Sequence, residues 1–253
     1  MSRKPDPFES PKRRLKRGKE HARRLEKRIQ SFLKKEPHQR VEDTDAEGVT
    51  THAIKFTRDF PHSWGDAAVE SIEALRSALD QIGYAAAILG GASEPKQAYF
   101  PIANTASDLD TVVKGRCKDI PTEIKTLFKG FNAHAGGNYT LWALNKLCGA
   151  NKHRLLTPFG ALAPEMRVGQ ATAMNGVEIF APRWSSERHQ IEFARVFPGG
   201  EFKYQAQISF FIGFDEFNGV KPAPAVGVLD AIASEVDRVL RATEAECRRI
   251  GLI

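Results

Sequence analysis

Four polar residues near the middle of the chain have the types and the spacing that acid–base chemistry needs. The run consists of Asn151, Lys152, His153 and Arg154, and it stands between a helical stretch and an apolar segment. A histidine exchanges protons near neutral pH, and neighbouring cations stabilise the charge that develops on a phosphate in the transition state. These residue types therefore fit metal-independent cleavage of RNA, with His153 as general acid or base.

A second helical stretch supplies the partners that such a site needs. Arg76 offers a cation for the phosphate, and Asp80, like Asn151, is suited to orient the histidine through a hydrogen bond. Arg76 and Asp80 are one helical turn apart, so they are also placed to pair with each other. The expected catalytic set is His153, Arg76, Asn151 and Asp80. The alternative is a buried polar network of these same residues that fixes how two helices cross.

Two predicted helices position these residues. Residues 138–150 carry apolar side chains at helical spacing, with Asn138 as the N-cap and Gly149 as the expected stop. Residues 63–90 form the best-marked helix, which we expect to open with Ser63 as N-cap and Asp66 as its capping-box partner.

The second half of the chain changes from helical spacing to strict alternation, which is typical of strands. The predicted strands are an early hairpin at 39–56 and later segments at 155–163, 177–181, 190–196 and 201–214. The turn at 198–200 is expected to join the last two as a hairpin, and a final helix is predicted at 225–249. The predicted fold is α+β, with helices packed on one face of an antiparallel sheet of five or six strands and with a long basic N-terminal helix.

The charge of the chain is uneven along its length. Residues 1–40 hold 15 Lys and Arg against five Asp and Glu, which is +10, so the other 22 basic and 26 acidic residues contribute −4 to the total of +6. Ser10 and Pro11 predict a helix that starts there and runs to about Lys35. Such a basic helix is typical of nucleic-acid binding. The expected contacts are Arg13, Arg14, Lys16, Arg17, Arg23, Arg24 and Lys27, together with Lys152 and Arg154.

The same helix has an apolar seam at alternating steps of three and four, formed by Leu15, Gly18, Ala22, Leu25, Ile29 and Phe32. This is a heptad pattern that Gly18 should weaken. The seam either packs on another helix of the chain, for which 225–249 is the candidate, or makes a homodimer. We therefore expect a basic arm at 1–37 and a single α+β domain at 38–253.

Composition excludes several classes of protein. Cys117, Cys148 and Cys247 are far apart and form no CxxC pair, which argues against a disulfide framework or a zinc finger. Because no apolar run approaches the length of a membrane span and no signal peptide is evident, we expect a cytoplasmic protein without a membrane partner. No phosphate-binding, dinucleotide-binding or zinc-protease motif is present, so no cofactor and no metal are expected.

Two segments carry a family resemblance. The stretches LRSALDQ and LWALNKLCGANKHRLL, at residues 75–81 and 141–156, resemble a family of uncharacterised bacterial proteins in which an R-S-A-L-D helix precedes an N-K-H-R segment. The resemblance covers most of the chain and implies no particular activity. More distantly, the arrangement is similar to the helical HEPN ribonucleases and nucleotide-binding proteins. The HEPN motif separates an Arg from a following His by four to six residues, whereas here Lys146 precedes His153 by seven.

Three hypotheses follow for the function of the chain. The first is a nucleic-acid-associated binding protein that uses the basic helix, and the second is a HEPN-like, metal-independent ribonuclease. The third is a non-catalytic protein that forms a homodimer or binds a protein partner through the seam.

The ribonuclease hypothesis predicts that His153→Ala abolishes RNA cleavage. The melting temperature should stay nearly unchanged, because in this hypothesis the imidazole transfers a proton and does not stabilise the fold. Gel analysis of an RNA probe measures the first effect and thermal unfolding the second. Equal cleavage by the variant would exclude this hypothesis.

Overall fold

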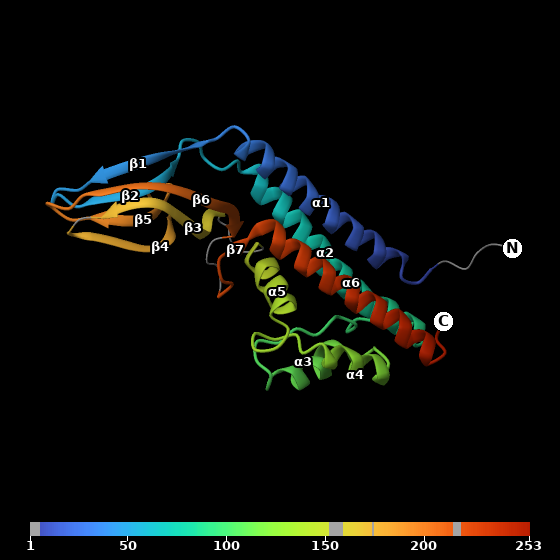
Figure 1. The fold of residues 1–253 in the computed structure, drawn as a ribbon. Helices are drawn as coiled ribbons and strands as arrows, with labels where there is room; N and C mark the ends of the chain where they lie inside the picture. Colours follow the sequence, from blue (N-terminus) through green and yellow to red (C-terminus); the bar gives the residue numbers. More distant parts are fainter. Residues whose placement is uncertain (1–5, 152–158, 174, 215–218) are drawn as a thin grey trace.

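The chain folds into a bundle of helices joined end to end with two antiparallel sheets, as Figure 1 shows. The computed structural model describes residues 6–151, 159–173, 175–214 and 219–253. Helices and antiparallel strands are both extensive, which confirms the predicted α+β class. Among the described residues, no helix combines the length and the apolar character that crossing a membrane requires.

Three long helices form the bundle. They are α1 (Glu9–Leu33), α2 (Ser63–Leu89) and α6 (Ala225–Arg249), and each contacts the other two. The seam of α1 is buried in this bundle at Leu15, Ala22, Leu25 and Ile29. Two ion pairs join α1 to α6, since Lys12 Nζ lies 2.5 Å from Glu244 and Lys19 Nζ lies 3.7 Å from Asp237. The seam therefore packs within its own chain, on α2 as well as on the expected final helix.

Helices α1 and α2 approach each other closely at Gly18. A Cβ atom at this position would lie 2.7 Å from Leu75 Cδ2, which is inside van der Waals contact. The hydroxyl of Ser71 donates a hydrogen bond of 2.8 Å to the carbonyl oxygen of Gly18. The expectation that Gly18 weakens the seam is therefore wrong, because only glycine leaves room for this approach.

Two sheets replace the single sheet that we expected. The first has the order β1-β2-β5-β4, with β1 (His38–Thr44), β2 (Thr50–Phe56), β5 (Gln190–Val196) and β4 (Val177–Ser185). The second has the order β3-β6-β7, with β3 (Phe159–Ala173), β6 (Phe202–Phe214) and β7 (Ala223–Pro224). The predicted hairpin across 198–200 is wrong, because β5 pairs with β2 and β4 whereas β6 pairs with β3 and β7. The turn instead carries the chain from one sheet to the other.

Aromatic side chains hold the two sheets together. The ring of His52 on β2 lies 5.4 Å from Phe202 and 5.5 Å from Tyr204, both on β6. Phe193 on β5 also meets Tyr204 edge to face at 5.5 Å. These centroid distances are in the range of favourable ring pairs. Phe202 and Tyr204 of β6 thus contribute to the apolar layer between the sheets.

Three short helices cover one side of the bundle: α3 (Leu109–Arg116), α4 (Thr122–Gly130) and α5 (Tyr139–Asn151). The predicted N-cap of α5 is confirmed, because Asn138 Oδ1 accepts a hydrogen bond of 3.2 Å from the backbone N–H of Leu141. The amide nitrogen of Asn138 also donates to Glu235 Oε2 at 2.7 Å. This one residue therefore starts α5 and ties it to α6.

The final helix was predicted at its observed bounds, but the predicted caps at Ser10 and Ser63 and the predicted stop at Gly149 were wrong. Helices α1 and α2 begin without a side-chain cap, and the hydroxyl of Ser10 donates instead to Gln81 Oε1 at 2.9 Å. Ser63 is the first residue of α2 and does not form the capping box with Asp66. Gly149 lies inside α5, which continues to Asn151. The starts of α1 and α2 each make a contact with the other helix, through Ser10 with Gln81 and through Arg28 with the carbonyl oxygen of Ser63.

The close approach at Gly18 predicts that Gly18→Ala destabilises the protein. Alanine favours helix over glycine by about 1 kcal/mol, but crowding in a packed core costs about 1–3 kcal/mol, and Leu75 is fully buried. We therefore expect a lower melting temperature.

Gly115→Ala in α3 is the matched control, because no atom lies within 4 Å of a Cβ built there. This variant should be neutral or slightly stabilised. A Gly18→Ala protein as stable as the control would contradict the packing described here.

Candidate functional site

The structure describes only part of the predicted catalytic set. Lys152, His153 and Arg154 lie outside the described residues, and so does the side chain of Asn151, the last residue of α5. Arg76 and Asp80 are described, and they form an ion pair in which Arg76 Nη2 donates to Asp80 Oδ1 at 2.9 Å. The pairing of Arg76 with Asp80, which their spacing of one helical turn allows, is therefore present.

Arg76 is a buried cation on the side of α2 that also carries Glu73 and Asp80. The residue is only 9% exposed, although arginine is almost never buried without partners. Its second terminal nitrogen, Nη1, is shielded from solvent and has no hydrogen-bond acceptor among the described residues. Leaving a buried donor unsatisfied costs about 1–3 kcal/mol, and more for a charged group. Arg76 therefore keeps a buried donor that no described residue uses.

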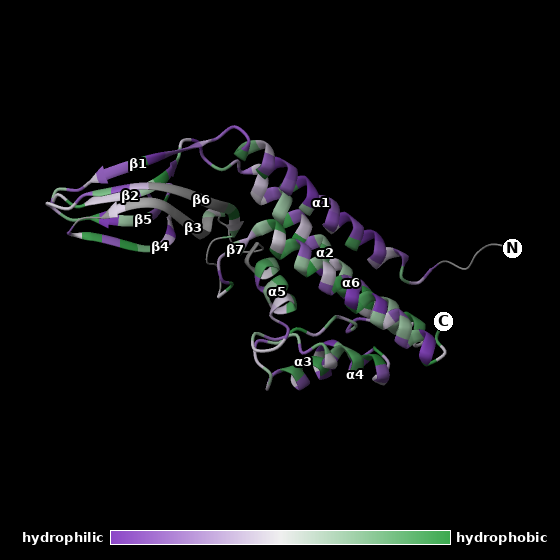
Figure 2. Cartoon of the chain, viewed as in Figure 1, coloured by the Kyte–Doolittle hydropathy of each residue, from purple (hydrophilic) through white to green (hydrophobic). Residues whose placement is uncertain are grey.

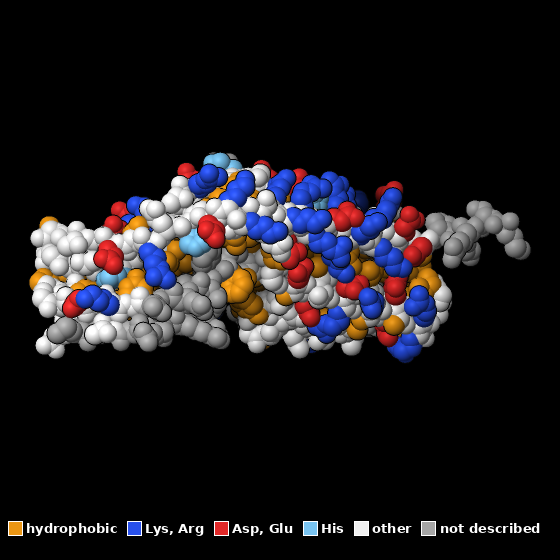
Figure 3. All heavy atoms as spheres, turned by 45° about the horizontal axis from the view of Figure 1, so that its top comes forward, with side chains coloured by type: hydrophobic (Ala, Val, Ile, Leu, Met, Phe, Trp, Pro, Cys, Tyr) orange, Lys and Arg blue, Asp and Glu red, His pale blue; other side chains and the backbone are white. Residues whose placement is uncertain are grey.

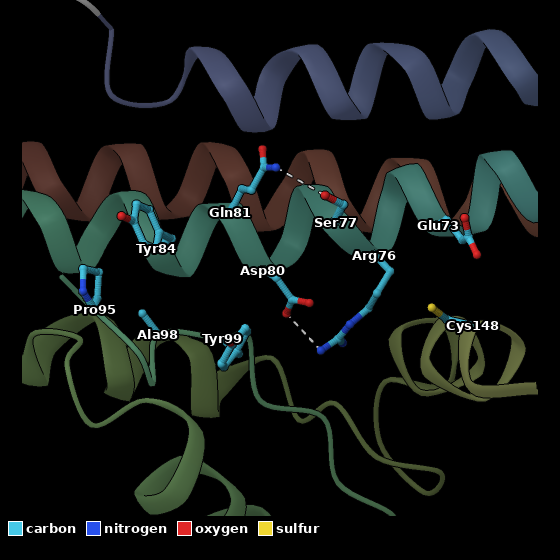
Figure 4. Close-up of a pocket in the computed structure, with 10 residues that line it drawn as sticks. All are labelled: Glu73, Arg76, Ser77, Asp80, Gln81, Tyr84, Pro95, Ala98, Tyr99 and Cys148. Atoms are coloured by element: carbon cyan, nitrogen blue, oxygen red, sulfur yellow. Dashed lines mark hydrogen bonds and ion pairs between the residues drawn. The ribbon is translucent and has the colours of Figure 1, made fainter. Parts of the chain in front are cut away.

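Arg76 and Asp80 face a cleft between α2, α5 and the segment around residues 95–99, as Figure 4 shows. The cleft consists of two adjoining hollows of about 480 and about 620 Å³. Arg76, Asp80, Tyr99 and Cys148 line both of them. Asn145, Cys148 and Gly149 of α5 line the second hollow, so this part of the helix lies beside Arg76 and Asp80.

Hydrogen bonds from backbone N–H groups fix the segment around residues 95–99, which forms the outer wall of the cleft. Asp119 Oδ2 accepts hydrogen bonds of 2.8 Å from the backbone N–H groups of Lys96 and Gln97. The N–H of Tyr99 donates to the carbonyl oxygen of Arg116 at 3.0 Å. The same wall passes so close to α2 that a Cβ at Gly83 would lie 2.5 Å from the carbonyl oxygen of Ala98. The backbone that carries Tyr99 and Arg116 is therefore held in place beside α2.

Burial raises the pKa of the Asp80 carboxyl above its usual value of 3.8, and the positive charges of Arg76 and Arg116 oppose this rise. A raised pKa means that the folded state holds the proton more tightly than the unfolded chain does. The contribution of Asp80 to stability is therefore greatest at acid pH and is lost as the pH rises through the folded pKa.

The basic residues of α1 form a second candidate site on the outer surface of the bundle. All of the described residues that we predicted to bind nucleic acid are exposed, namely Arg13, Arg14, Lys16, Arg17, Arg23, Arg24 and Lys27. Figure 2 shows α1 as the most hydrophilic of the three long helices, and Figure 3 shows Lys and Arg side chains gathered along it. We refer to these seven residues as the basic face.

Most of the basic face is not neutralised by carboxylates. Lys16 lies 4.0 Å from Glu20, and Arg17 Nε donates to His21 at 3.4 Å. The other five have neither a hydrogen bond nor an ion pair with any described residue: Arg13, Arg14, Arg23, Arg24 and Lys27. The helix that carries them is anchored by its seam, so these charges project from a rigid support.

Comparison of the chain with models of protein families, with curated proteins and with solved structures gave no match. Among the described residues, no group of three or more His, Cys, Asp or Glu could hold a metal ion. The site is therefore interpreted from its own geometry.

Sequence reasoning missed part of the cleft. It identified Arg76 and Asp80 by their spacing, and it noted Arg116 only as one member of a small basic cluster. It did not identify Tyr84, Tyr99 or Asn145. Tyr99 joins the cleft through backbone pairing with a segment 17 residues further along the chain, and no local pattern in the sequence signals this.

The raised pKa of Asp80 predicts a difference in pH dependence between wild type and Asp80→Asn. As the pH rises through the folded pKa of Asp80, the wild type must ionise a buried carboxyl and the variant does not. The unfolding free energy of the variant, relative to wild type, should therefore increase between about pH 3 and about pH 7. Denaturant unfolding at several pH values measures this difference.

Asp110→Asn provides a control of opposite sign. A hydrogen bond from Lys129 lowers the pKa of the Asp110 carboxyl, so here the wild type should gain relative to the variant as the pH rises. The effect should be small, because Asp110 is exposed. Parallel trends for the two variants would contradict the environment described for Asp80.

Proposed function

We propose that this chain binds nucleic acid through the basic face of α1. The observation that carries the proposal is the group of five exposed cations that have no carboxylate partner among the described residues. Clustered Lys and Arg bind polyanions by neutralising phosphates and releasing condensed counterions. If acidic residues neutralised these cations, contact with phosphates would add little binding free energy. Most cations of the basic face have no such neutralising partner among the described residues.

The length of α1 favours an extended ligand. From Arg13 to Lys27 the basic face covers about 21 Å, at 1.5 Å of rise per residue. The next residue, Arg28, is tied to the start of α2, because its Nη1 donates to the carbonyl oxygen of Ser63 at 2.8 Å. A duplex carries one charge for about every 1.7 Å of its axis, so the face spans many phosphates.

The proposed binding reads the phosphate backbone and not the bases. Direct readout uses Arg, Asn or Gln side chains that reach base edges from an element lying in a groove. The outward side chains of α1 are mainly Lys and Arg, and the helix is anchored along its length on α2 and α6. We therefore propose binding with little sequence preference.

RNA cleavage is a second candidate, and one observation favours it. Asn145, Cys148 and Gly149 of α5 line the same hollow as Arg76 and Asp80, and His153 follows the end of α5 by two residues in the sequence. This proximity along the chain makes His153→Ala worth testing for loss of cleavage.

A homodimer through the seam is less favoured, since the seam is buried against the chain's own helices. Dimerisation through it would require α1 to leave its bundle and pack on a second copy.

Reversing three charges of the basic face tests the proposal. Arg13→Glu, Arg24→Glu and Lys27→Glu combined should weaken binding to a duplex or single-stranded probe at least about tenfold, because phosphate contacts are lost and repulsion replaces them. Fluorescence anisotropy at one fixed salt concentration measures the dissociation constants.

A control with the same change in net charge separates the face from the overall charge. Lys114→Glu, Lys118→Glu and Lys221→Glu reverse three exposed lysines away from α1. Affinity close to wild type in this control supports the proposal. Equal weakening in both triple variants would show that only net charge matters.

A further inference from the structure

The cleft beside Arg76 has a polar end with an excess of positive charge. In the larger hollow, Arg76, Lys96 and Arg116 face a single carboxylate, Asp80. The side chain amides of Gln97 and Asn145 line the same hollow. Charge-assisted hydrogen bonds from guanidinium groups are the usual means of holding a phosphate or a carboxylate. The larger hollow is therefore suited to an anionic group.

Arg76 supplies the donor that such a group would satisfy. Its Nη2 is occupied by Asp80, whereas its buried Nη1 has no acceptor among the described residues. Figure 4 shows the side chain extending from α2 into the space between the 95–99 segment and α5. Because Nη1 is shielded from solvent, an anion reaches it only when the guanidinium turns into the hollow that Arg76 already lines. A bound anion would then provide the acceptor that the described part of the chain does not supply.

The other end of the cleft is aromatic. Tyr84 and Tyr99 line the smaller hollow together with Pro95 and Ala98, and the two tyrosines are 49% and 46% exposed. Exposed rings beside a cation are suited to contact a planar ring, since aromatic faces stack with little demand on its identity. The aromatic end adjoins the cationic end at Arg76, Asp80 and Tyr99, which both hollows share.

We propose that this cleft binds a small aromatic anion, that is, a planar ring that carries a phosphate or a carboxylate. The anionic group lies among Arg76, Arg116 and Lys96, and the ring lies against Tyr99 and Tyr84. This site is separate from the proposed nucleic-acid surface, because α1 lies on one side of α2 and the cleft on the other (Figure 4). The inference therefore does not depend on the function proposed for α1.

Isothermal titration of the full-length protein tests this site with four probes. AMP and benzoate each combine a ring with an anion, one as a phosphate and one as a carboxylate. Adenosine and inorganic phosphate each supply half of the AMP chemistry. At least one of the two aromatic anions should bind more tightly than inorganic phosphate and adenosine. The comparison of AMP with benzoate identifies the anionic group.

Two variants at exposed positions locate the binding without threatening the fold. Arg116→Gln should weaken the aromatic anion and inorganic phosphate alike, by roughly tenfold for a lost charge-assisted contact. Tyr99→Ala should weaken the aromatic anion by roughly tenfold, the effect of one lost stacking contact, and leave inorganic phosphate unchanged. Arg58→Gln, an exposed arginine away from the cleft, is the control and should bind as wild type does.

Several results would overturn the proposal. The proposal fails if neither aromatic anion binds at millimolar concentration, or if both bind no better than inorganic phosphate. Undiminished binding in both Arg116→Gln and Tyr99→Ala would place the ligand elsewhere. The triple charge reversal on α1 should leave binding in the cleft unchanged, so loss in that variant would also count against the site.

Discussion

Burial of α2 between α1 and α6 is the constraint on which the helical part of the structure depends. Apolar residues surround most of α2, and Ile72, Leu75, Leu79 and Ile82 have no exposed surface. A helix of this kind must be covered on several sides. Helix α1 covers one side, and Gly18 lets it approach until the backbone of α1 accepts a hydrogen bond from Ser71. The orientation of α1 follows from this contact, so its charged residues must face outward.

The burial of α2 also explains why a charged residue at position 76 is unexpected. Most positions that α2 buries are small or apolar, and burial of a charged group there costs free energy unless partners compensate for it. Asp80 compensates in part, since it satisfies one terminal nitrogen of the guanidinium. Among the described residues, the other terminal nitrogen has no acceptor, and it lies at the wall of a cleft that also holds Arg116 and two exposed tyrosines. A residue that served packing alone would not require these surroundings.

Local patterns in the sequence predicted those features that depend on neighbouring residues. The alternation in 190–196 coincides with β5, and Asn138 caps α5 as its position suggests. Features set by distant contacts were not predictable in this way. Ser10 has the side chain of an N-cap but bonds to Gln81 on α2, and the turn at 198–200 resembles a hairpin although its two strands belong to different sheets. In the cleft, Arg76 and Asp80 follow from spacing on one helix, whereas Tyr99 and Arg116 meet through a backbone hydrogen bond between a loop and the end of α3.

The central claim is that the basic face of α1 carries free positive charge on a fixed support and uses it to bind nucleic acid. The most direct measurement is the dissociation constant of the wild-type protein with a short DNA duplex over a series of salt concentrations. If the five cations that have no side-chain partner among the described residues each neutralise one phosphate, the logarithm of the association constant should fall against the logarithm of salt with a slope of about −4 to −5. A slope near zero, or no binding at low salt, would contradict the claim.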